Sequence, residues 1–350
     1  MSNRKLKTAT WFFAALIILS VITGTVFLWR QKMNNSQKFR VVISTDFPPL
    51  DARYPFKDGT PNSHKSDPDD LQSMVRFLLY SNEFDVEGLI ASSATFAGIA
   101  NKQNIIDMLD VYAAHYDTLK NYSLDYPSPE YLKSVTYQGN NGTWGRSAEE
   151  NIGENMDSEA SDAIIEIVDK KDSRPVWFCV WGDCSNIAQA VYRVSQTRTP
   201  EETAKFISKM RIYQIAHQDG SIDWLIENFP EMFIIYNENT YFGIFGADDI
   251  NWVNENIIEN HGKLGAAYPD RGMGCEGVCE GDSPSFLYLL SARFGHSNVE
   301  NPTLPSWGGK FKRVEGTNHY VDDVGSPSIS EHAKEFQKDF EKRLEIILIS

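Results

Sequence analysis

The feature that most constrains the fold of this 350-residue chain is a regular alternation of short apolar runs with helix-type segments. Residues 176–181 (Val-Trp-Phe-Cys-Val-Trp) are almost continuously apolar, which is typical of a central parallel strand covered on both faces. Similar strand-type runs occupy residues 40–44, 86–91, 212–216 and 232–236. Because strands and helices alternate without internal repeats, the sequence predicts an α/β fold with a mostly parallel central sheet flanked by helices.

The clearest helix start follows a loop rich in Pro, Asp, Gly, Asn and Ser at residues 48–65. Asp67 suits the N-cap, Pro68 suits the first helical position, and Asp69 and Asp70 suit the first turn, where the helix dipole favours acidic side chains. The apolar residues that follow give this helix a broad buried face. Further helices are expected over residues 104–116, 161–168, 186–194, 222–228, 283–294 and 330–349.

The N-terminal segment predicts export. Residues 11–29 are uncharged, begin and end with Trp, and are flanked on both sides by basic residues. At about 1.5 Å per residue this stretch spans roughly 28 Å, close to the hydrocarbon thickness of a bilayer. An uncleaved membrane anchor and a cleaved signal peptide both fit. The sequence therefore predicts that residues 1–38 form an anchor or signal segment with a spacer, and that residues 39–350 form one domain outside the cytoplasm, membrane-anchored or secreted.

The four cysteines are compatible with disulfide pairing in an exported protein. Cys275 and Cys279 are close enough in sequence to close a small loop, whereas Cys179 lies in an apolar run that is typical of a buried strand. A zinc site that uses these two residues, Cys179 and Cys184 is the alternative, although the spacing departs from the usual C-x₂-C pair.

Three acidic segments lie where a strand stops or a helix starts, which is where an α/β fold gathers its ligands. They are Asp46, residues 67–70 and residues 280–282. Each has an ordinary explanation as a helix cap or a loop acid. Carboxylates brought together repel strongly unless a proton or a cation lies among them, and calcium is a hard cation that prefers oxygen ligands. Together the three segments predict a calcium site.

Several segments carry a family resemblance in the order in which they occur. They are Thr45-Asp46, residues 68–82, 174–177, 180–190, Gln218-Asp219 with Trp224, Tyr268-Pro269, and residues 280–288 and 307–309. Over about residues 40–320 the chain resembles the inosine-uridine-type nucleoside hydrolases. It is more similar still to their exported nucleoside-hydrolase-like relatives among cellulose-binding and polysaccharide-associated proteins. The resemblance implies the nucleoside-hydrolase architecture.

The resemblance also implies residue roles. Asp46, Asp70 and Asp282 match the family's calcium-binding aspartates, the backbone carbonyl of Trp181 matches a further ligand, and Asp69 matches an aspartate that binds ribose hydroxyls. In the hydrolases the ion holds the ribose diol and a water. By this analogy Asp46 accepts a proton as the water attacks the anomeric carbon, and nearby negative charge stabilises an oxocarbenium-like transition state.

The chain departs from the family near the expected leaving group. Gly281 stands where some hydrolases have a histidine that protonates the base. The segment Asp223-Trp224-Leu225 replaces the Glu-Phe-Asn segment that contacts ribose and base, and it keeps only the acid. Asp223 and Trp224 are therefore expected to bind a substrate that is not an ordinary nucleoside. His217 and His319 are the histidines nearest to matched segments, although a single histidine is more often structural.

Other candidate contacts follow the central apolar run. Asp183 and Asn186 come directly after it, and Asn186 is expected either to bind substrate or to cap its helix. Tryptophan rings suit sugar faces or the core; for Trp177 the core is favoured, and for Trp224 and Trp307 both readings stand.

The sequence therefore predicts a calcium-dependent hydrolase of a glycosidic bond, N-ribosidic by analogy. One alternative is a non-catalytic carbohydrate-binding module that retains the metal cage, and another is an interaction protein in which the ion only stabilises the fold. The expected ligand is a small sugar, a nucleoside-type molecule or a polysaccharide, and the sequence is compatible with a homo-oligomer. A net charge of −15 argues against a nucleic-acid surface.

Overall fold

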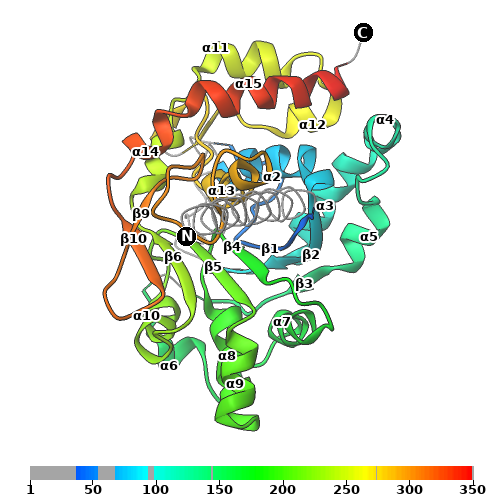
Figure 1. Cartoon of the computed structure of the whole chain (residues 1–350). Helices are drawn as coiled ribbons and strands as arrows, with labels where there is room; N and C mark the ends of the chain where they lie inside the picture. The colour runs from blue at the N-terminus through cyan, green and yellow to red at the C-terminus, as the bar shows by residue number, and fades with distance from the viewer. Residues whose placement is uncertain (1–36, 54–67, 94–97, 143–144, 273, 349–350) are drawn as a thin grey trace, which may run out of the picture.

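The computed structural model describes residues 37–53, 68–93, 98–142, 145–272 and 274–348. Their main sheet has eight strands in the order β3-β2-β1-β4-β5-β6-β10-β9 (Figure 1). All neighbouring strands are parallel except β10 and β9, so the predicted mostly parallel α/β sheet is confirmed. The strands are β1 (Phe39–Thr45), β2 (Phe84–Ala91), β3 (Thr136–Gln138), β4 (Val176–Val180), β5 (Met210–Ile215), β6 (Phe233–Asn237), β9 (Phe311–Arg313) and β10 (His319–Asp322).

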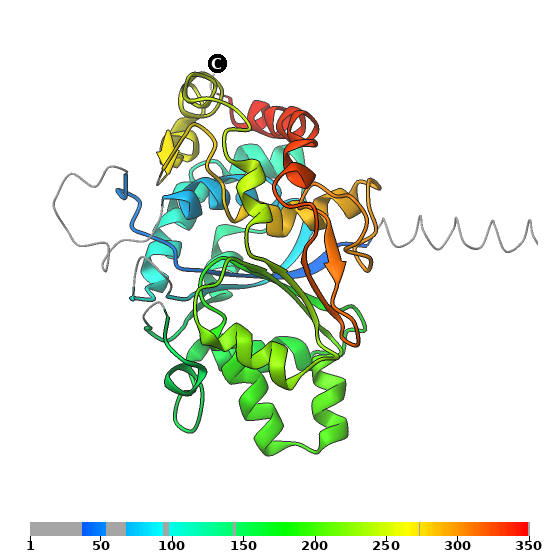
Figure 2. The same ribbon diagram turned by 90° about the vertical axis from the view of Figure 1, so that its left-hand side faces the viewer.

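Helices cover both faces of the sheet, and a hydrophobic core lies on each side (Figures 1 and 2). In β1, Val41 and Ile43 enter one core while Val42 enters the other, as the period-2 alternation of a strand requires. The first core is closed by helices drawn above the sheet in Figure 1, including α2 (Asp69–Leu79), α3 (Lys102–Ala113), α13 (Ser283–Arg293) and α15 (Ala333–Leu344). The second is closed by α7 (Glu159–Asp169), α8 (Ser185–Thr197), α9 (Pro200–Ile207) and α10 (Gly220–Asn228).

Most predicted helices are confirmed, but the C-terminal one is interrupted, and α9 and several shorter helices were not predicted. The helix expected over 330–349 is divided into α14 (Pro327–Ser330), α15 and the 3₁₀ turn η4 (Glu345–Ile347). Helix α9 was absent from the predicted elements, although Thr199 and Glu202 form a capping box in front of it. The remaining short elements are η1 (Ser81–Glu83), α4 (Tyr116–Tyr122), α5 (Pro129–Ser134), α6 (Ala148–Asn151), η2 (Thr240–Ile244), α11 (Ile250–Val253), η3 (Asn254–Ile258), α12 (Gly262–Ala267), β7 (Arg271–Gly272) and β8 (Cys275–Glu276).

The predicted membrane segment at residues 11–29 lies outside the described residues, as does the expected N-cap Asp67. Among the helices that the structure does describe, none is both long and apolar enough to cross a membrane. The division into residues 1–38 and 39–350 stays a prediction.

The cysteines fall into two kinds. Cys275 and Cys279 form a disulfide, while Cys179 and Cys184 are buried free thiols. The small loop considered from the sequence is therefore present. The four-cysteine zinc alternative is wrong, because two of its sulfurs are bonded to each other.

Candidate metal and sugar site

The candidate site lies where the central parallel strands end. In β1 and β4, Ser44 is paired with Val180, and the Trp181 backbone N–H donates a 2.7 Å hydrogen bond to the Ser44 carbonyl. This register places Asp46, which follows β1, and Trp181, which follows β4, at the same edge of the sheet. Carboxyl ends of parallel strands are the usual place for ligands in α/β folds.

Two helix starts bring three more carboxylates to one point. Asp69 and Asp70 open α2, and Asp282 is the N-cap residue of α13. One carboxylate oxygen from each of the three lies within 4.8 Å of the others. Asp70 and Asp282 are buried, whereas Asp69 is half-buried. We call Asp69, Asp70 and Asp282 the acidic group.

Asp46 lies beside the acidic group but is not one of the residues whose carboxylate oxygens all lie within 4.8 Å of one another. Asp46 nevertheless affects Asp70. The pKa of Asp70 is raised well above the usual range, first by burial and then by the charge of Asp46. The charges of the other two members of the acidic group raise this pKa further, while a hydrogen bond from the Thr45 hydroxyl lowers it. A proton or a cation is needed to offset this repulsion.

The donor set fits a hard cation. Carboxylate oxygens with a backbone carbonyl are typical calcium ligands. The Trp181 carbonyl faces the same strand edge and accepts a 3.2 Å hydrogen bond from Gln218 Nε2. Its indole ring is buried and donates to Ser285 Oγ at 2.9 Å, so the ring belongs to the core and only the backbone of Trp181 is available as a ligand.

Gly281 separates Glu280 from Asp282 and is packed tightly against Asp69. A Cβ at position 281 would lie 2.5 Å from Asp69 Oδ2, closer than real Cβ contacts allow. A histidine side chain at this position, which some hydrolases use as the leaving-group acid, would therefore displace Asp69. The position of Asp69 therefore requires a residue without a side chain at position 281, where some hydrolases have histidine.

The structure does not bring Asp223 and Trp224 into the acidic group. Asp223 Oδ2 lies 2.9 Å from Nε2 of His217, a residue that follows β5. Trp224 packs against Phe229, with ring centroids 5.3 Å apart, and against Tyr192, in the core on the α8 side of the sheet. Their substrate-binding roles stay predictions, and the geometry places Trp224 away from the acidic group.

The remaining candidates, Trp177, Trp307 and His319, are buried and pack within the fold. Trp177 is fully buried, and Trp307 is 3% exposed with its Nε1 donating to Glu335. His319 opens β10, so it lies at the opposite end of the sheet from the acidic group, and its Nε2 is 3.1 Å from the Phe229 carbonyl oxygen.

Asn186 lies in the first turn of α8 and is buried. Its Oδ1 accepts hydrogen bonds from the Asn140 backbone N–H at 3.2 Å and from Ser158 Oγ at 2.8 Å. Its Nδ2 has no hydrogen-bond partner among the described residues. Asn186 therefore fastens the loop after β3 to α8 instead of capping that helix, and its role toward substrate stays a prediction.

A second acidic pair lies next to the strand edge. Asp183 and Asp219 are both buried, and burial together with the charge of Asp219 raises the pKa of Asp183 to about 7. Hydroxyls of Ser93 and Ser185 each donate to Asp183 at 2.7 Å. Sequence reasoning noted Asp183 but missed this pairing, because about thirty-five residues that include two helices separate the partners.

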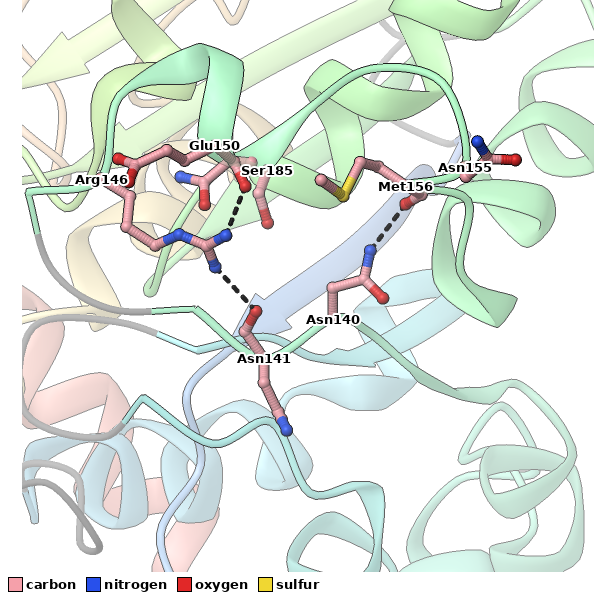
Figure 3. A pocket seen from close by; sticks show the side chains of 8 residues that line it. Asn140, Asn141, Arg146, Glu150, Asn155, Met156 and Ser185 are labelled. Carbon is pink, nitrogen blue, oxygen red and sulfur yellow. Dashed lines mark hydrogen bonds between the residues drawn. The ribbon is translucent and has the colours of Figure 1, made fainter.

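A polar pocket of about 220 Å³ adjoins the second acidic pair (Figure 3). Arg146 reaches across it to the carbonyl oxygens of Asn141 and Glu150, and Asn140 Nδ2 donates to the Met156 carbonyl at 2.6 Å. Two lining residues also bond the acidic pair, since Asn151 donates to Asp219 and Ser185 to Asp183. The lining comprises Asn140, Asn141, Arg146, Glu150, Asn151, Asn155, Met156 and Ser185. Such amides and hydroxyls suit a polyhydroxylated ligand.

Comparison with known proteins agrees with this architecture. The family described as "Cellulose-binding Sde182, nucleoside hydrolase-like domain" matches residues 62–311. The chain belongs to this family. A solved structure of a nucleoside hydrolase-related hypothetical protein from Saccharophagus degradans, associated with carbohydrate metabolism, is 31% identical, with a TM-score of 0.72. The alignment covers 89% of this chain and 72% of that one. No curated protein sequence matches the chain.

Membership in the Sde182 nucleoside hydrolase-like family confirms the resemblance drawn from the sequence motifs. The acidic residues that carried the resemblance after Asp46 all lie inside the matched range. The helix starts that carry Asp69, Asp70 and Asp282 thus lie in the nucleoside hydrolase-like part of the chain, whereas Asp46 precedes the matched residues.

Proposed function

We propose that this chain is a hydrolase that cleaves a glycosidic bond, N-ribosidic or of a related sugar, with calcium held by the acidic group. The observation that carries the proposal is the convergence of three carboxylates within 4.8 Å, with Asp46 close enough to raise the pKa of Asp70. Acids from two distant parts of the chain meet here and raise the pKa of Asp70, and a divalent cation would offset this repulsion.

The position and burial of each residue assign it a separate role. The buried Asp46, Asp70 and Asp282 would hold the ion together with the Trp181 carbonyl. A bound calcium ion would lower the pKa of a water and hold a sugar diol. Asp46 would accept the proton of that water, and the half-buried Asp69 would accept hydrogen bonds from sugar hydroxyls.

A second candidate function is calcium-dependent sugar binding without turnover. Gly281 favours it, because the tight contact with Asp69 leaves no room for a leaving-group acid at that position. The family also contains a protein described as cellulose-binding, which makes a polysaccharide a suitable ligand for a binding module.

We also propose that the domain acts outside the cytoplasm, anchored or secreted through its N-terminal segment. The Cys275–Cys279 disulfide supports this, since disulfides persist mainly in oxidising compartments. A protease added to intact cells should degrade the domain. Full protection would contradict export.

Calcium-dependent melting tests the ion site. A ligand bound only by the native state stabilises it by about 2.7 kcal/mol at 100 times Kd. The wild type should therefore melt at a higher temperature in calcium than in chelator, and Asp70→Asn should lose most of this shift. Glu154→Gln, an exposed acid on another segment, is the control and should keep it. An unchanged wild-type melting temperature would remove the ion site.

Release of free sugar tests turnover. Wild type, Asp46→Asn and Glu154→Gln are incubated in calcium with a panel of nucleosides and oligosaccharides. The hydrolase requires release by the wild type and by the control, with a loss of at least about 100-fold in Asp46→Asn, the size of a typical general-base contribution. Calcium-dependent binding of a sugar without any release would instead select the binding module.

A further inference from the structure

Three aromatic side chains gather on the turn that follows β6. Tyr241 and Phe242 stack with ring centroids 4.3 Å apart, and Phe245 meets the Phe242 ring edge-on at 5.3 Å. Phe242 is 45% exposed, while Tyr241 and Phe245 are half-buried. We call these three residues the aromatic platform. A contiguous group of partly exposed apolar rings marks a binding surface more often than a single exposed ring does.

The aromatic platform borders the acidic group. A Cβ built on Gly281 would lie 2.5 Å from Asp69 Oδ2 and 3.5 Å from both Tyr241 Cδ2 and Phe245 Cε1. One point in space therefore lies within 3.5 Å of a carboxylate oxygen and of two aromatic rings. The rings lie on the side of Asp69, the one member of the acidic group that is not fully buried.

The backbone beneath the aromatic platform is held by hydrogen bonds to both the sheet and the loop before α13. Asn237 Oδ1, at the end of β6, accepts from the Tyr241 N–H at 2.8 Å. The Gly246 N–H donates to the Val278 carbonyl at 2.8 Å, and the Val278 N–H donates to the Asp248 carbonyl at 3.0 Å. The aromatic platform is thus positioned by the same loop that leads to Asp282.

We propose that the aromatic platform stacks on one pyranose ring of a cello-oligosaccharide while the neighbouring sugar reaches Asp69, the most accessible member of the acidic group. A β-linked glucose ring presents apolar C–H faces and a rim of hydroxyls, so it needs a flat apolar surface beside hydrogen-bond acceptors. The aromatic platform and Asp69 supply these two elements side by side. This assignment rests on the proposed function, because it takes a sugar as the ligand of the acidic group.

A sugar ligand would also account for the exposure of Phe242. Burying Phe242 against the domain would remove its apolar surface from water, but the structure leaves nearly half of it accessible. A sugar face would cover that surface. Because a longer chain is needed to reach from Asp69 across the rings, the contribution should grow with the length of the oligosaccharide.

The test is calorimetric titration of the full-length protein with glucose and with cellohexaose in calcium. Phe242→Ala should weaken cellohexaose binding about tenfold, and it should leave the melting temperature and calcium affinity unchanged. Phe242→Trp should retain binding, and Phe242→Leu should lose it because leucine is apolar without a flat face. Tyr122→Ala is the control, since Tyr122 is 62% exposed and belongs to α4. The aromatic platform lies on η2 and the residue that follows it, η2 packs against α14, and α4 and α14 lie on opposite sides of the molecule (Figure 1).

Each result separates this assignment from the proposed function. Equal cellohexaose affinity in wild type and Phe242→Ala, or equal losses in Phe242→Ala and Tyr122→Ala, would overturn the aromatic platform and leave the ion site untouched. A wild type that binds no cellohexaose would also overturn it, while calcium-dependent melting and release of other sugars would still judge the hydrolase. Binding that depends on Phe242 but persists in chelator would support the platform and count against the ion.

Discussion

Arg76 and Glu280 form an ion pair in which both side chains are fully inaccessible to solvent. Arg76 Nη2 lies 3.0 Å from Glu280 Oε1, and Glu280 also accepts hydrogen bonds from Tyr268 Oη at 2.7 Å and Ser283 Oγ at 2.6 Å. Arg76 belongs to α2, the helix that begins with Asp69 and Asp70. Glu280 lies two residues before Asp282, the third member of the acidic group. The pair therefore fixes the two halves of the acidic group relative to each other.

Arg76→Met should destabilise the protein by about 3–5 kcal/mol, because it leaves the Glu280 charge buried without its partner. Urea denaturation in chelator measures this directly. Lys133→Ala is the matched control, since its 2.5 Å pair with Asp110 is exposed and should contribute less than about 1 kcal/mol. Similar losses in the two variants would show that the buried pair has no special structural role.

Without calcium, the acidic group should make the protein more stable as the pH falls. The pKa of Asp70 is raised in the folded state, so the folded protein binds a proton at this site before the unfolded chain does. Asp70→Asn removes this charge and should be more stable than wild type in chelator at pH 7.5. The difference in free energy of unfolding should shrink as the pH falls through the raised pKa toward about 3.9, the unfolded value.

Calcium should reverse that ranking at neutral pH, because the ion stabilises the ionised carboxylates of the wild type only. Parallel denaturation series in chelator and in calcium, from pH 7.5 to 4.5, measure both effects. A wild type that is more stable than Asp70→Asn in chelator at pH 7.5 would contradict the repulsion on which the ion site is argued.

Gly281→Ala should weaken calcium binding by about tenfold, or about 1.4 kcal/mol. The new methyl group would meet Asp69 Oδ2 and push this carboxylate out of the acidic group. The same substitution in an Asp69→Ala background removes the clash and should change affinity less than twofold, so the two effects should be strongly non-additive. Additive losses, measured by calcium titration of the four proteins, would place the effect of Gly281 elsewhere.

Replacing both Cys275 and Cys279 by serine should cost about 2 kcal/mol, the loop-entropy contribution of a crosslink between residues four apart. The loop keeps a second attachment to α2, since Gln72 accepts from the Cys279 N–H at 2.6 Å and donates to the Gly277 carbonyl at 2.9 Å. The fold should therefore survive. A reductant should lower the melting temperature of the wild type and leave the double variant unchanged; an equal shift in both would assign the effect to something other than this disulfide.

Local patterns determined the secondary structure well. The almost continuous apolar run at 176–181 corresponds to β4, with a neighbour on either side, and the acidic, Pro-led start at 68–70 corresponds to the first turn of α2. These signals are readable because strand burial and helix capping depend on residues that are close in sequence. The same patterns placed Asp46, Asp69, Asp70 and Asp282 at element ends, which is where the structure has them.

Relationships between distant segments were decided only by the tertiary structure. Glu280 lies in one of the acidic segments that predict the calcium site, but in the fold it pairs with Arg76. Trp224 packs against Phe229 in the core on the α8 side of the sheet, and its contact with a sugar stays a prediction. The aromatic platform had no signal in the sequence, because it matters only through its position beside Asp69. Sequence periodicity determines which face of an element is buried, whereas the partner of a buried charge or an exposed ring depends on the packing of elements that lie far apart along the chain.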